Sequence, residues 1–246
     1  MRISLPTESE LEKGSSLGKD AWSRLRKNKL AMISMCFIGF MLIVCFIVAP
    51  LPFVDDPNEQ NLANRFASPS ADHIMGTDQL GRDLFSRILF GGQISMLVGF
   101  VATGVALIIG ITYGAISGYA GGRTDAIMMR IVDTLYAIPF LVLVIVLKVV
   151  IAGPMEEYLS WLGRFANIVP LFFAIGALGW LTLARITRTQ VMAIKEQEFV
   201  EAATSLGLSK LRILFRHIVP NTLGPAIVYA TLTIPSFILF EASLSY

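Results

Sequence analysis

Charged residues are scarce in this sequence, and so are the residue types that form catalytic or metal sites. Only 15% of the 246 residues are charged, whereas 54% are hydrophobic and the mean hydropathy is +0.67. This composition excludes an ordinary soluble domain, which carries more charge. The net charge of +2 is too small to indicate a nucleic-acid partner. We therefore expect most of the chain to lie in lipid.

The few cysteines and histidines form no disulfide or metal pattern. Cys36 and Cys45 lie in one apolar run. On a helix they would be about 13 Å apart along the axis, which is too far for a disulfide bond. His73 and His217 are isolated from the cysteines and from each other. We interpret all four as structural residues.

A nucleotide-binding loop is also missing. Residues 14–19 resemble GxxxxGK[ST] only superficially, because the spacing is one residue short and Asp20 stands at the Ser/Thr position. ATP is therefore expected to bind elsewhere. A membrane-embedded enzyme would need clustered polar residues within its spans. The only candidates are His73, Asp78 and Asp83 in a polar segment, and they match no ligand spacing.

A channel or secondary transporter is a further alternative, and it would place ionisable side chains near the middle of the membrane. The few available here are Asp133, Lys148 and Glu241, which lie toward the ends of apolar runs. This pattern weighs against a pathway for ions or protons.

Long apolar runs predict about five membrane-spanning helices, since about 20 residues cross a bilayer core. The runs cover residues 30–51, 94–118, 131–151, 168–183 and 222–241. Because residues 1–29 are mostly polar and the first run is too long for a signal peptide, we expect it to remain as an anchor. The predicted fold class is all-α, a polytopic membrane helix bundle.

Charge in the loops predicts the orientation. Arg24, Arg26, Lys27 and Lys29 precede the first run and place the N-terminus in the cytoplasm. The following segment is broken by prolines and is acidic, so it should face outward. The predicted divisions are a cytoplasmic segment 1–29, a first transmembrane helix 30–51, an external segment 52–93 and a core 94–246, which contains a basic cytoplasmic loop at about 184–221.

Small residues in the second run predict close helix packing. Gly110, Gly114 and Gly118 recur at intervals of four and lie on one side of a helix. Such a stripe lets another helix backbone approach closely.

The cytoplasmic loop begins with a predicted helix. Residues 188–206 contain no proline or glycine, and Gly207 then supplies a residue suited to ending a helix. Phe199, Ala203 and Leu206 share one face at helical spacing. Glu201 points elsewhere beside Ala202, which predicts a flat surface of small residues flanked by an acid.

A second helix should follow in the same loop. Ser209 is suited to cap it, and Pro220 should end it. Asn221 or Thr222 would then cap the last span. The apolar stripe of this helix comprises Leu211, Leu214, Phe215 and Ile218. On pattern alone the loop is either an interfacial support for its neighbours or a projection that docks into a partner protein.

Two strings in this loop favour docking. Glu201–Gly207 reads EAATSLG, and Phe215–Asn221 reads FRHIVPN. They resemble the EAA loop of ABC importer permeases, which has Glu-Ala-Ala, a glycine four residues after the second alanine, and a proline near the end.

Other segments are similar to the C-type permease subunits of dipeptide, oligopeptide and nickel importers. They are Trp22–Lys29, Gly76–Asp83, Gly118–Gly122 with Arg130 and Asp133, and Glu241–Ser245. The resemblance covers the chain from about residue 20 to its end and implies the ABC type I importer permease fold. That family normally has a sixth span, and this chain ends where the preceding external loop is expected, so we expect a truncated chain.

The resemblance also implies roles and partners. Glu201 would meet basic or polar groups on an ATPase subunit, Ala202 and Ala203 would allow close approach, and Gly207 would turn the chain. Pro220 and Asn221 complete the motif. The implied partners are a second permease subunit, two ATP-binding subunits, an external binding protein and the lipid of a bacterial inner membrane, with no nucleic acid.

The resemblance implies no catalytic residue, cofactor or metal in this chain, because ATP and Mg²⁺ would bind the partner ATPase subunits. Dipeptides, longer peptides, glutathione and nickel complexes are all substrates of relatives of this branch. Nothing in the spans separates these substrates.

Overall fold

The computed structural model describes residues 17–51, 54–166 and 168–244. Ser245 of the family-like ending and most of the predicted segment 1–29 lie outside the described residues. Within the described residues the secondary structure is helical and contains no strand, which confirms the all-α prediction. The chain divides into two units, residues 1–93 and residues 94–246, and each is described separately.

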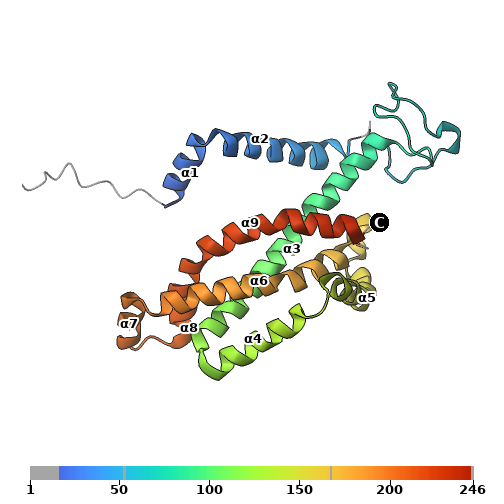
Figure 1. Cartoon of the computed structure of the whole chain (residues 1–246). Helices are drawn as coiled ribbons and strands as arrows, with labels where there is room; N and C mark the ends of the chain where they lie inside the picture. Colours follow the sequence, from blue (N-terminus) through green and yellow to red (C-terminus); the bar gives the residue numbers. More distant parts are fainter. Residues whose placement is uncertain (1–16, 52–53, 167, 245–246) are drawn as a thin grey trace, which may run out of the picture. The chain divides into compact units, whose positions relative to one another are not determined.

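The first unit contains the predicted first span. Helix α1 (Leu17–Lys27) precedes α2 (Lys29–Ile43), which continues as a π-helical turn, Val44–Val48 (Figure 1). The side chain of Asn28 caps α2 by accepting a hydrogen bond of 3.2 Å from the backbone N–H of Ala31. Residues 29–48 form one apolar helix long enough to cross a membrane.

Residues 54–83 form a folded loop that contains one short 3₁₀ turn, Leu62–Asn64. Asp78 organises its second half by accepting hydrogen bonds from the backbone N–H groups of Leu80 and Arg82 and from the Arg82 side chain. Burial raises the pKa of Asp78, but these hydrogen bonds and the Arg82 charge lower it more, to about 2. The carboxylate is therefore ionised at physiological pH.

Helix α3 (Leu84–Ala120) begins earlier than the predicted second span. Asp83 ends the loop and accepts a hydrogen bond of 2.8 Å from the backbone N–H of Ser86. This is the bond that an N-cap residue makes. The start at Leu84 therefore follows from a polar cap, whereas hydropathy located only the later apolar part of the helix.

The second unit contains the rest of α3 and all later elements. These are α4 (Gly122–Tyr136), α5 (Phe140–Tyr158), a 3₁₀ turn (Ser160–Phe165), α6 (Val169–Lys195), α7 (Glu198–Ser205), α8 (Lys210–Ile213), a π-helical turn (Leu214–Ile218) and α9 (Val219–Leu244). Buried residues of α6 are the largest part of its main hydrophobic core. Four helices of the described chain are long and apolar enough to cross a membrane, or five if α4 and α5 count as one broken span.

The predicted third span over residues 131–151 is not one continuous helix. Helices α4 and α5 meet at a bend of 95°, and Pro139 stands immediately before α5. Proline has no N–H and disfavours helical geometry in the residue before it, here Ile138. The apolar run continued through this break, so hydropathy alone did not reveal it.

The glycine stripe on α3 packs against α6, which confirms the predicted close approach. A Cβ atom at Gly110 would lie 2.6 Å from the Leu183 Cβ, and one at Gly118 would lie 2.7 Å from the Arg188 carbonyl oxygen. At Gly114 it would collide with the carbonyl oxygen of Ala184. The two helices therefore approach closely at three positions over about two turns of α3.

This packing predicts that Gly114→Ala destabilises the chain. Overpacking a close contact costs about 1–3 kcal/mol. Gly104→Ala is the matched control on the same helix, because a Cβ there meets nothing within 4 Å. The control should be neutral or slightly stabilising, since alanine favours a helix by about 1 kcal/mol over glycine. Unfolding of the chain in detergent, followed by circular dichroism, measures both, and equal midpoints would contradict the predicted packing.

Candidate functional site

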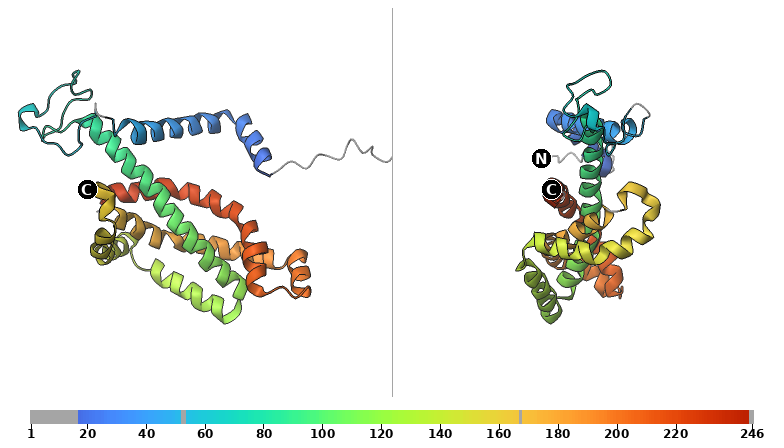
Figure 2. Two further views of the ribbon diagram at one scale, coloured as in Figure 1. Left: turned by 180° about the vertical axis from the view of Figure 1, so that it is seen from behind. Right: turned by 90° about the vertical axis from the view of Figure 1, so that its right-hand side faces the viewer.

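The loop singled out by the sequence forms a helical projection. Helices α7 and α8 lie together at the end of the second unit where α6 finishes and the chain turns back into α9 (Figures 1 and 2). We call residues 196–209, which include α7 and the turns on either side of it, the projection. It contains four of the six residues that the resemblance selected.

The predicted continuous helix over residues 188–206 is wrong. Helix α6 ends at Lys195, and α7 starts at Glu198 after Gln197, whose backbone is extended with φ −82° and ψ 148°. No proline or glycine marks this break. Glu198 and Glu201 lie in the first turn of α7, where acidic side chains favour a helix start. The break is the position at which packing of α7 onto the bundle overrides helix propensity.

Gly207 ends α7, as its sequence position predicted. Its φ is +76°, a backbone region that favours glycine. The N–H of Gly207 donates to the Thr204 carbonyl at 2.9 Å, and the N–H of Leu208 donates to the Ala203 carbonyl at 3.2 Å. These two hydrogen bonds form a Schellman motif, which satisfies the last carbonyl groups of the helix.

The inward face of α7 attaches the projection to the bundle. Val200 and Ala203 are buried in a second hydrophobic core, which we call the anchor cluster. Its buried members are Ala115, Val191, Ile194, Val200, Ala203, Ile213, Leu214 and Ile218. They come from the end of α3, the end of α6, α7, α8 and the π-helical turn before α9. The projection therefore shares one hydrophobic core with these elements.

The predicted common face of Phe199, Ala203 and Leu206 is wrong. Ala203 is only 8% exposed, whereas Phe199 is 40% exposed and Leu206 is 81% exposed. The inward face uses Val200 with Ala203, and the break at Gln197 sets this rotation. Ala203 therefore contacts the chain's own core and is not part of the accessible surface.

The outward face of α7 carries small and acidic side chains. Glu198, Glu201, Ala202 and Ser205 are exposed, and Leu206 projects at the end of the helix. This face is flat because Ala202 and Ser205 are small. It combines a flat centre and two carboxylates, and the exposed apolar side chains of Phe199 and Leu206 lie on the same short helix and its end.

The second predicted helix of the loop continues into the last span. Pro220 does not end it, because residues 210–244 run as one helical element through a π-helical turn. In that turn the Val219 N–H donates to the Leu214 carbonyl. The Asn221 side chain donates to the His217 carbonyl at 2.6 Å. Proline is tolerated near a helix start and where neighbouring groups satisfy the freed carbonyl groups.

The predicted apolar stripe of this segment is half correct. Leu214 and Ile218 are buried, whereas Leu211 and Phe215 are exposed. Ile213, which the predicted stripe did not include, is buried in the anchor cluster with Leu214 and Ile218. Ser209 stands at the N-cap position of α8, as predicted, but its side chain makes no capping hydrogen bond.

An ion pair that the sequence did not predict joins α6 to α4. Arg188 on α6 donates two hydrogen bonds of 2.5 Å to the carboxylate of Asp125 in the first turn of α4. Ser117 on α3 donates to the same carboxylate at 2.6 Å. This group joins α3, α4 and α6. The sequence showed Asp125 and Arg188 only as separate loop charges, and no local pattern pairs residues so far apart in the chain.

Further polar contacts join the same helices. Arg185 donates to Asp133 at 2.6 Å and stacks on the Tyr136 ring, 4.2 Å from its centre. Lys195, the last residue of α6, donates to the Tyr119 carbonyl at the end of α3 at 2.8 Å. Both contacts are exposed, so they contribute less than the Asp125 group.

A hollow of about 470 Å³ lies in the second unit beside the bend between α4 and α5. Residues 135–140 line it together with parts of α5, α6 and α9. Tyr136, Thr182 and Tyr229 are among its polar lining residues. None of the described residues that line it is charged.

Residues 110–246 match the family described as binding-protein-dependent transport system inner membrane component. Residues 16–69 match the N-terminal TM domain of oligopeptide transport permease C. The names of similar, curated proteins agree with these two family matches. The oligopeptide transport system permease protein OppC of Bacillus subtilis is 45% identical over 96% of this chain and 72% of that protein.

Two further relatives extend this agreement. The dipeptide transport system permease protein DppC of Bacillus subtilis is 41% identical over 94% of this chain and 68% of that protein. OppC of Haemophilus influenzae is 42% identical over 97% of this chain and 73% of that protein. Because these proteins are permease components of transport systems, partner subunits are implied. The chain belongs to this family and is a multi-pass inner-membrane transport component, not an enzyme.

Proposed function

We propose that this chain is a permease subunit of an ATP-driven importer for oligopeptides or dipeptides. The relatives' names support this substrate class. The observation that carries the proposal is the two-sided geometry of α7, which buries Val200 and Ala203 in the anchor cluster and exposes Ala202 and Glu201. A helix attached on one side and accessible on the other is suited to receive force from a partner.

We further propose the partners and the orientation. The importer would contain a second permease subunit, two ATP-binding subunits that bind ATP and Mg²⁺, and an external binding protein that delivers the peptide. The basic residues before α2 favour a cytoplasmic N-terminus. With that orientation the projection faces the cytoplasm, where nucleotide is available.

The projection would dock into a groove of an ATP-binding subunit through its outward face. Glu201 would pair with a basic or polar group there, and Ala202 would permit close approach. Gly207 ends α7 and reverses the chain direction, which limits the length of the projection. Pro220 and Asn221 would act at a distance from the contact, since they shape the helix that starts behind the anchor cluster.

Movement of the projection would reach the spans through two routes. The anchor cluster connects α7 to the ends of α3 and α6. The Asp125 group connects α6 to α3 and α4. A shift of α7 would therefore move packed helices together, as interlocked side chains transmit displacement. We expect such movement to change the shape of the hollow beside the α4–α5 bend, because α6 lines this hollow.

The docking proposal predicts that Ala202→Leu and Glu201→Ala each impair assembly. The leucine side chain would separate the surfaces, and the loss of the carboxylate would leave a partner group unpaired. We expect ATP-binding subunits to bind at least about tenfold more weakly, equal to about 1.4 kcal/mol. Co-purification of the complete complex and peptide uptake into proteoliposomes measure this effect.

The control for docking is Ala193→Leu, which enlarges an exposed alanine on α6 outside the projection. It should leave assembly and uptake unchanged. Unfolding of the permease chain should be the same in Ala202→Leu and in the control, because both residues are exposed. Glu201→Ala should destabilise the chain by no more than about 1 kcal/mol, because it removes one acidic side chain from the first turn of α7. If Ala202→Leu and Glu201→Ala assemble and transport as well as the control, the docking role of α7 is wrong.

The transmission proposal predicts that Asp125→Asn reduces peptide uptake per ATP hydrolysed. Asparagine cannot form the double charged contact with Arg188, and hydrogen bonds to charged groups contribute about 1.5–3 kcal/mol. Assembly should persist because α7 is unchanged. Parallel measurement of ATP hydrolysis and uptake gives the ratio. Asp133→Asn is the control, because its exposed pair with Arg185 should contribute less than about 1 kcal/mol. A ratio equal to that of the control would refute transmission through Asp125.

The orientation predicts that Ser209→Cys is protected from a membrane-impermeant maleimide in intact cells. Ser209 is exposed beside the projection, so permeabilisation should allow labelling. Ala71→Cys in the predicted external segment is the control and should label without permeabilisation. Both are made with Cys36 and Cys45 replaced by alanine. Labelling of Ser209→Cys in intact cells would contradict the predicted topology.

A further inference from the structure

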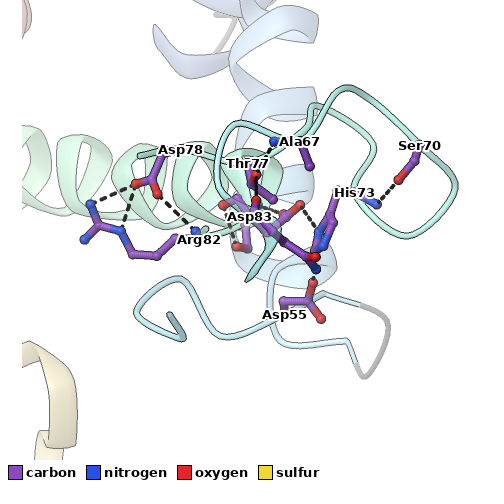
Figure 3. Close-up of polar contacts among 10 residues, drawn as sticks. Asp55, Ala67, Ser70, His73, Thr77, Asp78, Arg82 and Asp83 are labelled. Atoms are coloured by element: carbon purple, nitrogen blue, oxygen red, sulfur yellow. Dashed lines mark hydrogen bonds and ion pairs between the residues drawn. The ribbon is translucent and has the colours of Figure 1, made fainter. Parts of the chain in front are cut away.

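Three possible metal ligands converge in the folded loop of the first unit. Figure 3 shows the side chains of Asp55, His73 and Asp83 directed toward one another. The Nδ1 atom of His73 lies 3.2 Å from an Asp83 oxygen and 3.8 Å from an Asp55 oxygen. All three donor atoms lie within 4.8 Å of one another. The sequence offers His73 and Asp83 only as members of a polar segment without ligand spacing, and it does not single out Asp55 as their neighbour.

The separations fit ligands around one small cation. Zinc bonds to nitrogen and oxygen are about 2.0–2.2 Å long, which places tetrahedral ligands about 3.4 Å apart. The distances from His73 to its two partners lie on either side of this value. Asp55 is exposed, so a modest side-chain movement would bring its oxygen closer.

The surrounding loop holds two of the three groups in place. Asp83 is buried, and its other oxygen accepts the Ser86 N–H at the start of α3. The backbone N–H of His73 donates to the Ser70 side chain at 3.1 Å. The backbone next to Asp83 is also fixed, since Thr77 and Asp83 form an isolated β-bridge and the Asp78 N–H donates to the Arg82 carbonyl at 3.0 Å. Ligand positions are therefore largely preorganised.

Asp55, His73 and Asp83 line a second, smaller hollow, whose charges favour a cation. Its volume is about 160 Å³, and Asp55, Asp56, Glu59 and Asp83 line it with His73. None of the described lining residues is lysine or arginine. The nearest arginines in sequence, Arg82 and Arg87, both pair with Asp78. Four carboxylates and one imidazole thus share a small space without a fixed positive side chain.

We propose that Asp55, His73 and Asp83 bind one divalent transition-metal ion of the Zn²⁺ type. An imidazole nitrogen in the set favours Zn²⁺ and similar ions over Mg²⁺ and Ca²⁺, which prefer oxygen ligands alone. Glu59 lines the same hollow and is placed to supply a fourth oxygen. The ion would join the segment after α2 to the first residue before α3. Its role is structural, because it closes two loops of the chain.

The test measures metal binding by the full-length chain, purified without a polyhistidine tag, stripped with chelator and dialysed against Zn²⁺. We expect one tightly bound Zn²⁺ per chain and a raised unfolding temperature. His73→Gln and Asp55→Asn should each weaken binding by more than about 100-fold, since even groups that only support a ligand contribute about 10- to 100-fold. Both variants should keep the fold, because neither residue caps a helix. Co²⁺ should give visible absorption bands with the unaltered chain and lose them with His73→Gln.

The matched control is Asp72→Asn, which removes an exposed carboxylate beside His73 but outside the hollow. Its Zn²⁺ affinity should equal that of the unaltered chain. Equal affinity in His73→Gln would show adventitious binding and overturn the proposal. Tighter binding of Ca²⁺ or Mg²⁺ than of Zn²⁺ would overturn the proposed ion class. Absence of Zn²⁺ uptake by the unaltered chain would identify the cluster as a histidine ion pair and overturn the metal site.

Discussion

At Gly114 the backbone of α3 lies directly against the backbone of α6, and much of the second unit depends on this contact. One turn later Gly118 lies against the Arg188 carbonyl oxygen. The same approach brings Ser117 of α3 within hydrogen-bonding distance of Asp125, which Arg188 also contacts. A side chain on the glycine stripe would separate α3 from α6 and weaken the polar group as well as the packing. The small residues therefore set the position of the charged ones.

The anchor cluster extends this arrangement to the projection. Helix α7 has only eight residues, and an isolated helix of that length is unstable in water. Its rigidity must therefore come from the contacts of Val200 and Ala203 with the cluster and from the Schellman turn at Gly207. Because α7 is folded only while it is attached, a partner that holds its outward face also holds the ends of α3 and α6.

The features that could be predicted from the sequence depend on local chemistry. The first span follows from an uncharged apolar run, the glycine stripe follows from its spacing, and the end of α7 follows from a glycine that adopts positive φ. Glu201 and Ala202 were also expected on an accessible surface. In each case the residue and its near neighbours contain the whole physical reason, so no knowledge of distant contacts was required.

The features that could not be predicted depend on tertiary contacts. The break at Gln197 carries no proline or glycine, and it arises where α7 packs onto the bundle. That break rotates Ala203 inward, so a motif residue expected to meet a partner instead packs in the chain's own core. Pro220 continues a helix because a π-helical turn and the Asn221 side chain satisfy neighbouring carbonyl groups. The approach of Asp55 to His73 and Asp83 is likewise produced by the fold of the loop, because the three residues are distant in sequence.

The family motif therefore contains residues of two physical kinds. Ala203 and Gly207 attach and shape the projection, and Asn221 supports the helix that follows it, whereas Glu201 and Ala202 are exposed on the projection. Substitutions of the first kind should change the stability of the chain by itself. Substitutions of the second kind should change the stability of the isolated chain less, because these side chains are exposed. In the proposed docking this combination is required, because α7 must be attached to its own chain on one side and accessible to a partner on the other before it can transmit movement.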